Sequence, residues 1–376
     1  MRRIKVLSVF GTRPEAIKMA PLIKALEQTP SMKSIVCVTA QHREMLDQVL
    51  QSFGIVPDFD LSIMQAGQTI SDITIRVLEG LERVIRNVSP DIVLVHGDTT
   101  TTFASALAAF YSRVRVGHVE AGLRTYNKHE PFPEEMNRVL TSSIADLHFS
   151  PTSKAKENLL REGFQENTIF VTGNTAIDAL RLTLSDSYVF QESMLNSIDF
   201  HRRRVITVTA HRRENLGAPL EDICKSCADI VSQYDDVEIV FPVHLNPEVR
   251  QTAASVLGSL PRVHLLPPLS IRDMHNLLNR SYMVMTDSGG LQEEVPSMGK
   301  PVLVLRNVTE RPEGVEAGTL KLVGSRRETI VVAAQELLES EHAYNKMARA
   351  VNPFGDGRAS DRIVQAIIDY FQGIPV

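Results

Sequence analysis

Short apolar runs, many of them rich in β-branched residues, alternate with longer segments of helical spacing along most of the chain. A strand that is apolar at successive positions must be covered on both faces, and the helices that connect parallel strands provide that cover. The alternation therefore predicts an α/β fold, in which parallel sheets are built from strand-helix-strand units and are doubly wound.

The predicted elements form two series. The first has strands at 4–10, 34–39, 91–95, 114–119, 147–150 and 169–172, with helices at 15–27, 45–53, 70–85, 102–111 and from 174 onward. The second has strands at 205–210, 237–243, 263–266, 282–285, 302–305 and 320–323, with helices at 220–233, 247–257, 271–279, 328–338 and 359–371. With 376 residues the chain can form two domains, and we expect their connection in the polar stretch 185–199.

Composition excludes several classes of function. The net charge is -5 and there is no long basic run, so nothing indicates nucleic-acid binding. No apolar segment approaches the roughly 20 residues that span a bilayer. The N-terminal apolar run is too short for a signal peptide and predicts a first strand. We expect a soluble, cytoplasmic protein that does not contact membranes.

The three cysteines do not indicate a disulfide framework. Cys224 and Cys227 form a CxxC motif, which could hold zinc or act in redox chemistry. They share helical spacing with Ile223 and Ile230, however, and no second pair of ligands lies nearby. We therefore predict a packed helix face and no metal site.

Charged residues and glycines follow almost every predicted strand, where ligands bind in open α/β sheets. These segments are 11–15, 96–99, 120–124, 211–215, 244–247, 287–290 and 306–312. Each has an ordinary alternative: Asp98 could cap a helix, Arg13 and Lys18 could be solvated charges, and His211 could be a core histidine. Together they predict a cleft with cations for a diphosphate and carboxylates for proton transfer.

Residues 281–301 read as a buried strand, a Gly-Gly turn and a helix. Gly289 and Gly290 would let the backbone approach an anion, which the free N–H groups and positive end of the helix would attract. Glu294, one turn later, could accept hydrogen bonds from a ribose. The alternative is an ordinary turn whose glycines serve only its geometry.

The segment 131–138, PFPEEMNR, places two carboxylates after two prolines. Acidic residues are common at a helix start, which is the simpler interpretation. If Glu134 lies near Asp98 and Glu120, the three carboxylates would repel one another. That repulsion would raise at least one pKa and supply an acid and a base.

These segments resemble the non-hydrolysing UDP-N-acetylglucosamine 2-epimerases of bacteria. The resemblance covers nearly the whole chain in order and is carried by GTRPEAIKMAP (11–21), TAQHREMLDQ (39–48), LVHGDTTTT (94–102), GHVEAGLRT (117–125), PFPEEMNR (131–138), VTGNTAIDAL (171–180), TAHRREN (209–215), PVHLNP (242–247), TDSGGLQEE (286–294) and RPEGVEAGT (311–319).

The resemblance implies two Rossmann-like domains in a GT-B arrangement, with the active site in the interdomain cleft. The expected N-terminal domain is 1–185, with the C-terminal helix 359–376 packed back on it, and the UDP-binding domain is 186–358. It also implies a homodimer that needs neither nicotinamide nor metal. The implied reaction is reversible epimerisation of UDP-N-acetylglucosamine to UDP-N-acetylmannosamine by elimination of UDP, through a 2-acetamidoglucal, and re-addition. The product would supply surface polysaccharides.

Site residues follow from the same resemblance. The catalytic positions are Asp98, Glu120, Glu134 and His211. The substrate-binding positions are Arg13, Lys18, Asp98, Glu120, His211, Leu269, Met274, Ser288, Gly289, Gly290, Glu294 and Arg311. Gln41, Glu44, Arg212 and His244 resemble positions where some bacterial members bind a second UDP-N-acetylglucosamine as an activator. Leu269 and Met274 fall at about the positions where relatives usually carry a glutamine and an aromatic residue beside the uracil. A methionine can still cover the face of a base, with less geometric definition than an aromatic ring.

Three other functions fit parts of the pattern. A hydrolysing epimerase uses the same elimination but releases UDP and N-acetylmannosamine, and HGDTTTT with GHVEAGLRT argues against it. A GT-B glycosyltransferase would need an acceptor. A nucleotide-sugar sensor without catalysis would have no use for three carboxylates.

Overall fold

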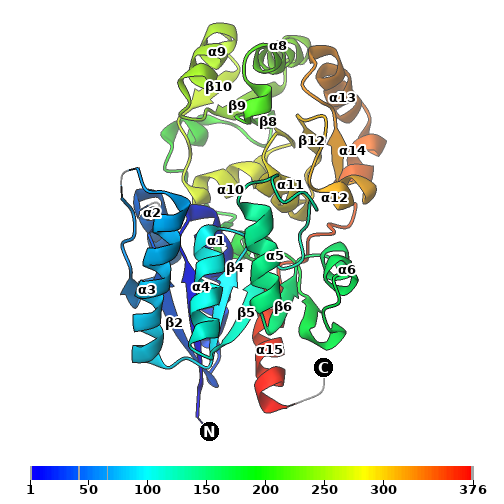
Figure 1. The fold of residues 1–376 in the computed structure, drawn as a ribbon. Helices are drawn as coiled ribbons and strands as arrows, with labels where there is room; N and C mark the ends of the chain where they lie inside the picture. Colours follow the sequence, from blue (N-terminus) through cyan, green and yellow to red (C-terminus); the bar gives the residue numbers. More distant parts are fainter. Residues whose placement is uncertain (1, 41–42, 66, 374–376) are drawn as a thin grey trace. The chain divides into compact units, whose positions relative to one another are not determined.

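The computed structural model describes residues 2–40, 43–65 and 67–373, apart from the side chains of residues 43–45. The chain divides into two compact units, which we describe separately. The first comprises residues up to Leu182 together with those from Phe354 onward, and the second runs from Thr183 to Pro353. Each unit contains one parallel sheet with helices on both faces (Figure 1). The predicted pair of Rossmann-like α/β folds is confirmed. Within the described ranges, no helix is both long and apolar enough to cross a membrane.

The sheet of the first unit has the strand order β3-β2-β1-β4-β5-β6-β7. Its strands are β1 (Ile4–Phe10), β2 (Met32–Val38), β3 (Phe59–Asp60), β4 (Ile92–His96), β5 (Arg115–Val119), β6 (Leu147–Ser150) and β7 (Ile169–Val171). Strand β1 pairs with both β2 and β4, so the order reverses direction between β1 and β4. Ligands bind at such a reversal, beyond the carboxyl ends of the two strands.

Helices cover both faces of this sheet. They are α1 (Arg13–Gln28), α2 (Arg43–Phe53), α3 (Ile70–Val88), α4 (Thr100–Tyr111), α5 (Glu134–Ile144), α6 (Ser153–Arg161), α7 (Thr175–Thr183) and α15 (Ala359–Gln372). Leu7 and Val9 of β1 share a core cluster with Leu81 of α3 and Ala108 of α4. Helix α15, the last of the chain, packs against α1.

Gly11 shows why the loop after β1 needs a glycine. A Cβ on this residue would lie 2.0 Å from Oγ1 of Thr39 and 2.9 Å from Oγ1 of Thr101. Those two hydroxyls are buried and lie 3.1 Å apart. The missing side chain therefore lets the loop after β1 pass close to the starts of two other connections.

The sheet of the second unit has the order β10-β9-β8-β11-β12-β13, which reverses between β8 and β11. Its strands are β8 (Arg204–Thr209), β9 (Val237–Pro242), β10 (Val263–Leu266), β11 (Met283–Thr286), β12 (Val302–Val304) and β13 (Leu320–Leu322). The helices are α8 (Ala218–Gln233), α9 (Pro247–Leu257), α10 (Ile271–Arg280), α11 (Gly289–Glu294), α12 (Pro312–Glu316), α13 (Arg327–Glu339) and α14 (Glu341–Ala348).

Cys224 and Cys227 are fully buried on α8, in one core cluster with Ile206, Phe241 and Met285. Burial raises the pKa of the Cys224 thiol to about 12 and also raises that of Cys227. A buried, protonated thiol is a poor nucleophile and metal ligand. The predicted packed helix face is confirmed.

The stretch 185–199, where we expected the connection between domains, packs against the sheet of the second unit. Phe190, Leu195 and Ile198 are buried in a cluster with Val205 of β8 and Val240 of β9. Tyr188 meets Phe190 edge-on, with the ring centroids 5.4 Å apart. These three buried apolar residues are separated by polar residues at irregular intervals. The sequence of this stretch therefore shows neither helical nor strand periodicity.

Candidate functional site

Loops that follow β1, β4 and β5 gather at one edge of the first sheet, because these strands are parallel neighbours. Glu120, directly after β5, has φ of +65°. This left-handed conformation is uncommon for a residue with a side chain, and such strain concentrates at functional sites. The predicted residues Arg13, Asp98 and Glu120 thus come from three adjacent strand ends.

The Glu120 carboxylate is held by groups from other elements. Its Oε2 forms an ion pair with Lys18 of α1 and accepts a hydrogen bond of 3.0 Å from Nδ2 of Asn174. Nε2 of His96 lies 3.9 Å from the same oxygen. Burial lowers the pKa of His96 to about 4, so the ring is neutral near pH 7. Glu120 is therefore a fixed carboxylate with a cation beside it.

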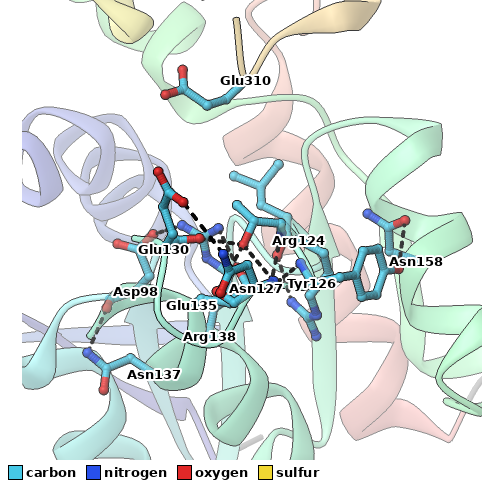
Figure 2. Close-up of polar contacts among 12 residues, drawn as sticks. Asp98, Arg124, Tyr126, Asn127, Glu130, Glu135, Asn137, Arg138, Asn158 and Glu310 are labelled. Atoms are coloured by element: carbon cyan, nitrogen blue, oxygen red, sulfur yellow. Dashed lines mark hydrogen bonds and ion pairs between the residues drawn. The ribbon is translucent and has the colours of Figure 1, made fainter. Parts of the chain in front are cut away.

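Asp98, after β4, belongs to a second network (Figure 2). Its carboxylate pairs with Arg138 of α5, and its carbonyl oxygen accepts a 2.9 Å hydrogen bond from Nδ2 of Asn137. Arg138 also contacts Oε2 of Glu135 at 3.0 Å. The other oxygen of buried Glu135 accepts the N–H groups of Thr125 and Tyr126 at 3.0 and 2.9 Å. Helix α5 thereby fastens both Asp98 and the loop after β5.

Two predicted residues of this unit have no polar partner among the residues that the structure describes. Arg13, in the first turn of α1, is partly buried, and burial lowers the pKa of its guanidinium. Glu134, the first residue of α5, is partly buried as well. Among the described residues, neither side chain makes a hydrogen bond or an ion pair. A partly buried guanidinium without a counter-ion is suited to bind an anionic ligand.

Two of the three carboxylates in the predicted cluster have a cation beside them. Asp98 is paired with Arg138, and Glu120 with Lys18. These ion pairs offset the mutual repulsion that the sequence predicts. Glu134 is the carboxylate of the three with no described cation beside it.

Sequence reasoning missed the residue that joins two of these loops. Glu15 is buried, and its Oε2 accepts the N–H groups of Gly11 at 3.0 Å and Thr12 at 2.8 Å. Its Oε1 accepts the hydroxyl groups of Thr99 at 2.8 Å and Thr102 at 3.1 Å. The one available signal was the capping box of α1, in which Thr12 and Glu15 cap each other.

In the second unit the buried carboxylate that holds a loop is Asp287, which sequence reasoning also missed. It follows β11, is fully buried, and accepts the N–H groups of His211 and Arg212 at 2.8 Å each. The His211 ring stacks on that of His244, with centroids 5.0 Å apart and an angle of 10°. Burial lowers the pKa of His211, and the positive charge of Arg212 acts in the same direction, while Asp287 opposes it.

The predicted anion seat lies at the start of α11. Ser288 precedes the helix, and a Cβ on Gly289 would be 3.6 Å from Nη2 of Arg212 and 4.0 Å from Nη2 of Arg311. Arg311 is fixed by an ion pair with buried Glu293. Two guanidinium groups therefore flank a stretch of backbone that carries no side chain, which suits a diphosphate.

Glu294 closes the same helix. Its Oε2 lies 3.4 Å from Nε2 of His275, and Nδ1 of this buried histidine is 2.7 Å from the hydroxyl of Thr183. A Cβ on Gly290 would lie 3.6 Å from Oε1 of Glu294. The carboxylate is thus turned back toward the glycine turn, where a ribose would lie if the diphosphate occupies the seat.

Leu269 and Met274, the residues predicted to lie beside the base, belong to apolar clusters, and two other predicted residues lie outside the description. Leu269 is buried in the cluster that contains Phe190, and Met274 packs against it. Gln41 and the side chain of Glu44, two predicted activator positions, lie outside the described residues. No group of three or more histidine, cysteine or acidic residues that could hold a metal occurs within the described ranges.

Fold and site together define a class: a protein of two Rossmann-like units whose strand ends carry arginines and fixed carboxylates suited to a nucleotide diphosphate. The model of one family, UDP-N-acetylglucosamine 2-epimerase, matches residues 24–368. The chain belongs to this family.

Individual relatives agree over nearly the whole chain. The UDP-N-acetylglucosamine 2-epimerase of Bacillus subtilis (strain 168) is 56% identical over 371 residues, which are 99% of this chain and 97% of the relative. The solved UDP-GlcNAc 2-epimerase from Neisseria meningitidis, bound to UDP-GlcNAc, is 48% identical with a TM-score of 0.88, covering 97% of this chain and all of that one. The S. aureus protein MnaA, solved with UDP, is 51% identical with a TM-score of 0.88, covering 99% and 97%.

Proposed function

We propose that this protein interconverts UDP-N-acetylglucosamine and UDP-N-acetylmannosamine without net hydrolysis. Family membership supports the substrate class. The observation that carries the proposal is that one unit has arginines suited to an anion and the other has fixed carboxylates suited to proton transfer. Arg212 and Arg311 flank a bare backbone seat in one unit, and Glu120 and Asp98 are fixed carboxylates in the other. An elimination needs both, an anion site for the departing UDP and a base for the sugar.

The C2 hydrogen of the sugar is not acidic by itself, so the reaction we propose couples its removal to the loss of UDP from C1. A carboxylate takes the proton from C2 while the C1–O bond breaks, and the electron pair leaves with UDP. The uncharged 2-acetamidoglucal that remains is then protonated at C2 on the opposite face, and UDP adds back at C1. Atoms and charge balance, and no oxidant or metal is required.

We assign the proton transfers to two of Asp98, Glu120 and Glu134. Glu120 has the features of a base that works in the ionised form, because Lys18 and Asn174 stabilise its charge. Glu134 has no described cation beside it, and we assign it the role of the acid. Arg212, Arg311 and Arg13 would stabilise the negative charge that develops on UDP, with His211 near the departing oxygen.

Uridine recognition and regulation complete the proposal. Because Leu269 is buried, we assign the contact with the uracil ring to Met274 and to the backbone around it. Glu294, held by His275, would accept the ribose hydroxyl groups. We retain the homodimer and an activator site at Gln41, Glu44, Arg212 and His244 as proposals from the family resemblance, together with a role in supplying surface polysaccharides.

One experiment separates this function from its competitors. The protein is incubated with UDP-N-acetylglucosamine alone in heavy water, and the sugar is followed by proton NMR. We expect UDP-N-acetylmannosamine, with deuterium at C2 in both sugars at equilibrium. Accumulation of UDP and free N-acetylmannosamine would identify a hydrolysing enzyme instead. An unchanged substrate that turns over only when an acceptor is added would identify a glycosyltransferase.

A further inference from the structure

Asp287 uses its two carboxylate oxygens for different contacts. Oδ2 accepts three hydrogen bonds, from the N–H groups of His211 and Arg212 at 2.8 Å and from Nδ2 of Asn215 at 3.0 Å. Oδ1 is buried and has no hydrogen-bond partner among the described residues. It lies 3.5 Å from Nδ1 of the His211 ring. One oxygen thus fixes the backbone of the loop after β8, and the other is aimed at the ring.

An unsatisfied buried carboxylate oxygen is costly, so a group that can donate to it is strongly favoured at that position. The nearby ring nitrogen is such a group when it carries a proton. If Nδ1 were bare, its lone pair would face a negatively charged oxygen. The contact is longer than a good hydrogen bond, but bonds of this kind are often long without substrate and shorten when it binds.

We propose that Asp287 is a positioning residue that holds the proton of His211 on Nδ1, so that Nε2 is the ring nitrogen presented to the phosphate of the substrate. The role of Asp287 and His211 in turnover rests on the proposed function. Which ring nitrogen of His211 carries the proton in the ligand-free protein does not depend on that function. Asp287 itself contacts no ligand in this scheme, because it is fully buried beneath the loop.

The groups packed against the ring restrict it further. His244, after β9, stacks nearly parallel on His211 and limits its rotation. Burial, His244 and Arg212 all lower the pKa of His211, and Asp287 is the group that raises it. The carboxylate therefore does two things that an amide of the same shape cannot do: it keeps the proton of the neutral ring on Nδ1, and it stabilises the protonated ring.

The substitution Asp287→Asn distinguishes the effect of Asp287 on the His211 ring from its hydrogen bonds to the loop backbone. The amide oxygen can still accept the N–H groups of His211 and Arg212, and its NH₂ group then faces Nδ1 as a donor. The ring must present a lone pair there, which moves the proton of the neutral ring to Nε2. The protein is labelled with ¹⁵N-histidine, and the signals of His211 are identified by their loss in His211→Gln. In the ligand-free wild type at pH 8 we expect the ¹⁵N shifts of a ring protonated at Nδ1, and in Asp287→Asn those of a ring protonated at Nε2.

Kinetic measurements test whether Asp287→Asn changes kcat by way of His211. We expect Asp287→Asn to lower kcat about 100-fold or more, as expected when a catalytic imidazole is held in the wrong tautomer. We also expect the pH dependence attributed to His211 to move to lower pH. In the His211→Gln background the same substitution should cost less than about 3-fold, because the residue it acts through is already gone.

Two results would overturn the proposal: the wild-type ring protonated at Nε2, or an equal loss of kcat from Asp287→Asn in both backgrounds, which would mean structural support only. UDP affinity of Asp287→Asn, measured by calorimetry, should stay within about 3-fold of the wild type, and a larger loss would show that the substitution damages the anion seat rather than the ring. A wild-type protein that does not epimerise the sugar would refute the proposed function, while the NMR result would still decide the tautomer.

Discussion

Oε1 of Glu15 accepts a hydrogen bond of 2.8 Å from the hydroxyl of Thr99, a residue 84 positions away in the chain. Through this contact one buried carboxylate joins the first turn of α1 to the first turn of α4. Arg13 lies in the first of these turns, and Asp98 lies directly before Thr99. The spacing between Arg13, a candidate anion-binding residue, and Asp98, a candidate catalytic residue, therefore depends on the buried carboxylate of Glu15.

Replacing Glu15 should lower stability in a graded way. Glu15→Leu removes both acceptors and leaves the buried N–H groups of Gly11 and Thr12 unpaired, so we expect a loss of about 2–4 kcal/mol in the free energy of unfolding. Glu15→Gln keeps one oxygen for those groups and can donate to the threonine hydroxyls, so about 1 kcal/mol is expected. Urea denaturation measures both. Glu27→Gln, on the exposed side of the same helix, is the control and should change stability by less than about 0.5 kcal/mol. Equal losses in Leu and Gln variants would contradict this account.

Removing the candidate acid and base groups should reduce turnover. Asp98→Asn, Glu120→Gln and Glu134→Gln are each expected to lower kcat at least about 100-fold, the usual scale for acid-base residues. Conversion of UDP-N-acetylglucosamine is followed by NMR, with Glu157→Gln on the exposed face of α6 as the control. A variant that turns over at nearly the normal rate would remove its residue from the catalytic set.

Asn174→Asp tests the charge of Glu120 without removing a side chain. Oδ1 of Asn174 accepts the N–H of Ala176 at 2.9 Å, and an aspartate preserves that bond. Its second oxygen would stand where Nδ2 now donates to Glu120. Because the added negative charge makes Glu120 harder to ionise, the acid limb of kcat against pH should move upward by about one unit. Asn345→Asp, beside Glu341 on α14, is the matched control. An unshifted acid limb would mean that Glu120 does not act in its ionised form.

Buried histidines should make the fold sensitive to acid. Burial lowers the pKa of His118 to about 3, against about 6.5 in the unfolded chain. Below pH 6.5 the unfolded chain takes up a proton that the folded protein refuses, so stability falls as the pH falls toward 3. One such group costs roughly 3 kcal/mol between pH 7 and pH 4.5.

His118→Gln can still donate to the carbonyl of Gly97, which the histidine contacts at 2.7 Å. Urea denaturation of this variant should therefore show a smaller loss of stability between pH 7 and pH 4.5, by about 3 kcal/mol. The same pH dependence in both proteins would show that His118 is not the group responsible.

Much of the fold could be predicted from the chain alone. Twelve strands were expected, and the strands of the structure lie within two residues of them at each end. Strand β3 was missed because it has only two residues, Phe59 and Asp60. Helix α14 was missed because none of its residues is buried, so it carries no apolar stripe. Helix α6 buries only Ala155, Asn158 and Leu159, which is too weak a pattern to recognise.

The candidate site could be predicted only as a set of residue types at strand ends. Sequence order places Asp98, Glu120 and His211 after strands, and parallel strands bring such residues to one edge of their own sheet. It does not say which side chains meet there. Arg138 was not expected to pair with Asp98, and Glu15 and Asp287 were not recognised as the residues that hold the loops.

The sequence by itself determined the two α/β units, because strand and helix periodicity are local properties of the chain, and it placed charged residues and glycines at the strand ends. Only the tertiary structure decided the partners of those charges. Asp287 and His211 are 76 residues apart, and Asp98 and Arg138 are 40 apart. Contacts across such distances depend on the order of strands in each sheet and on how the connecting helices pack. No spacing in the sequence encodes them, although they decide which carboxylates are paired with cations and which ring nitrogen faces a ligand.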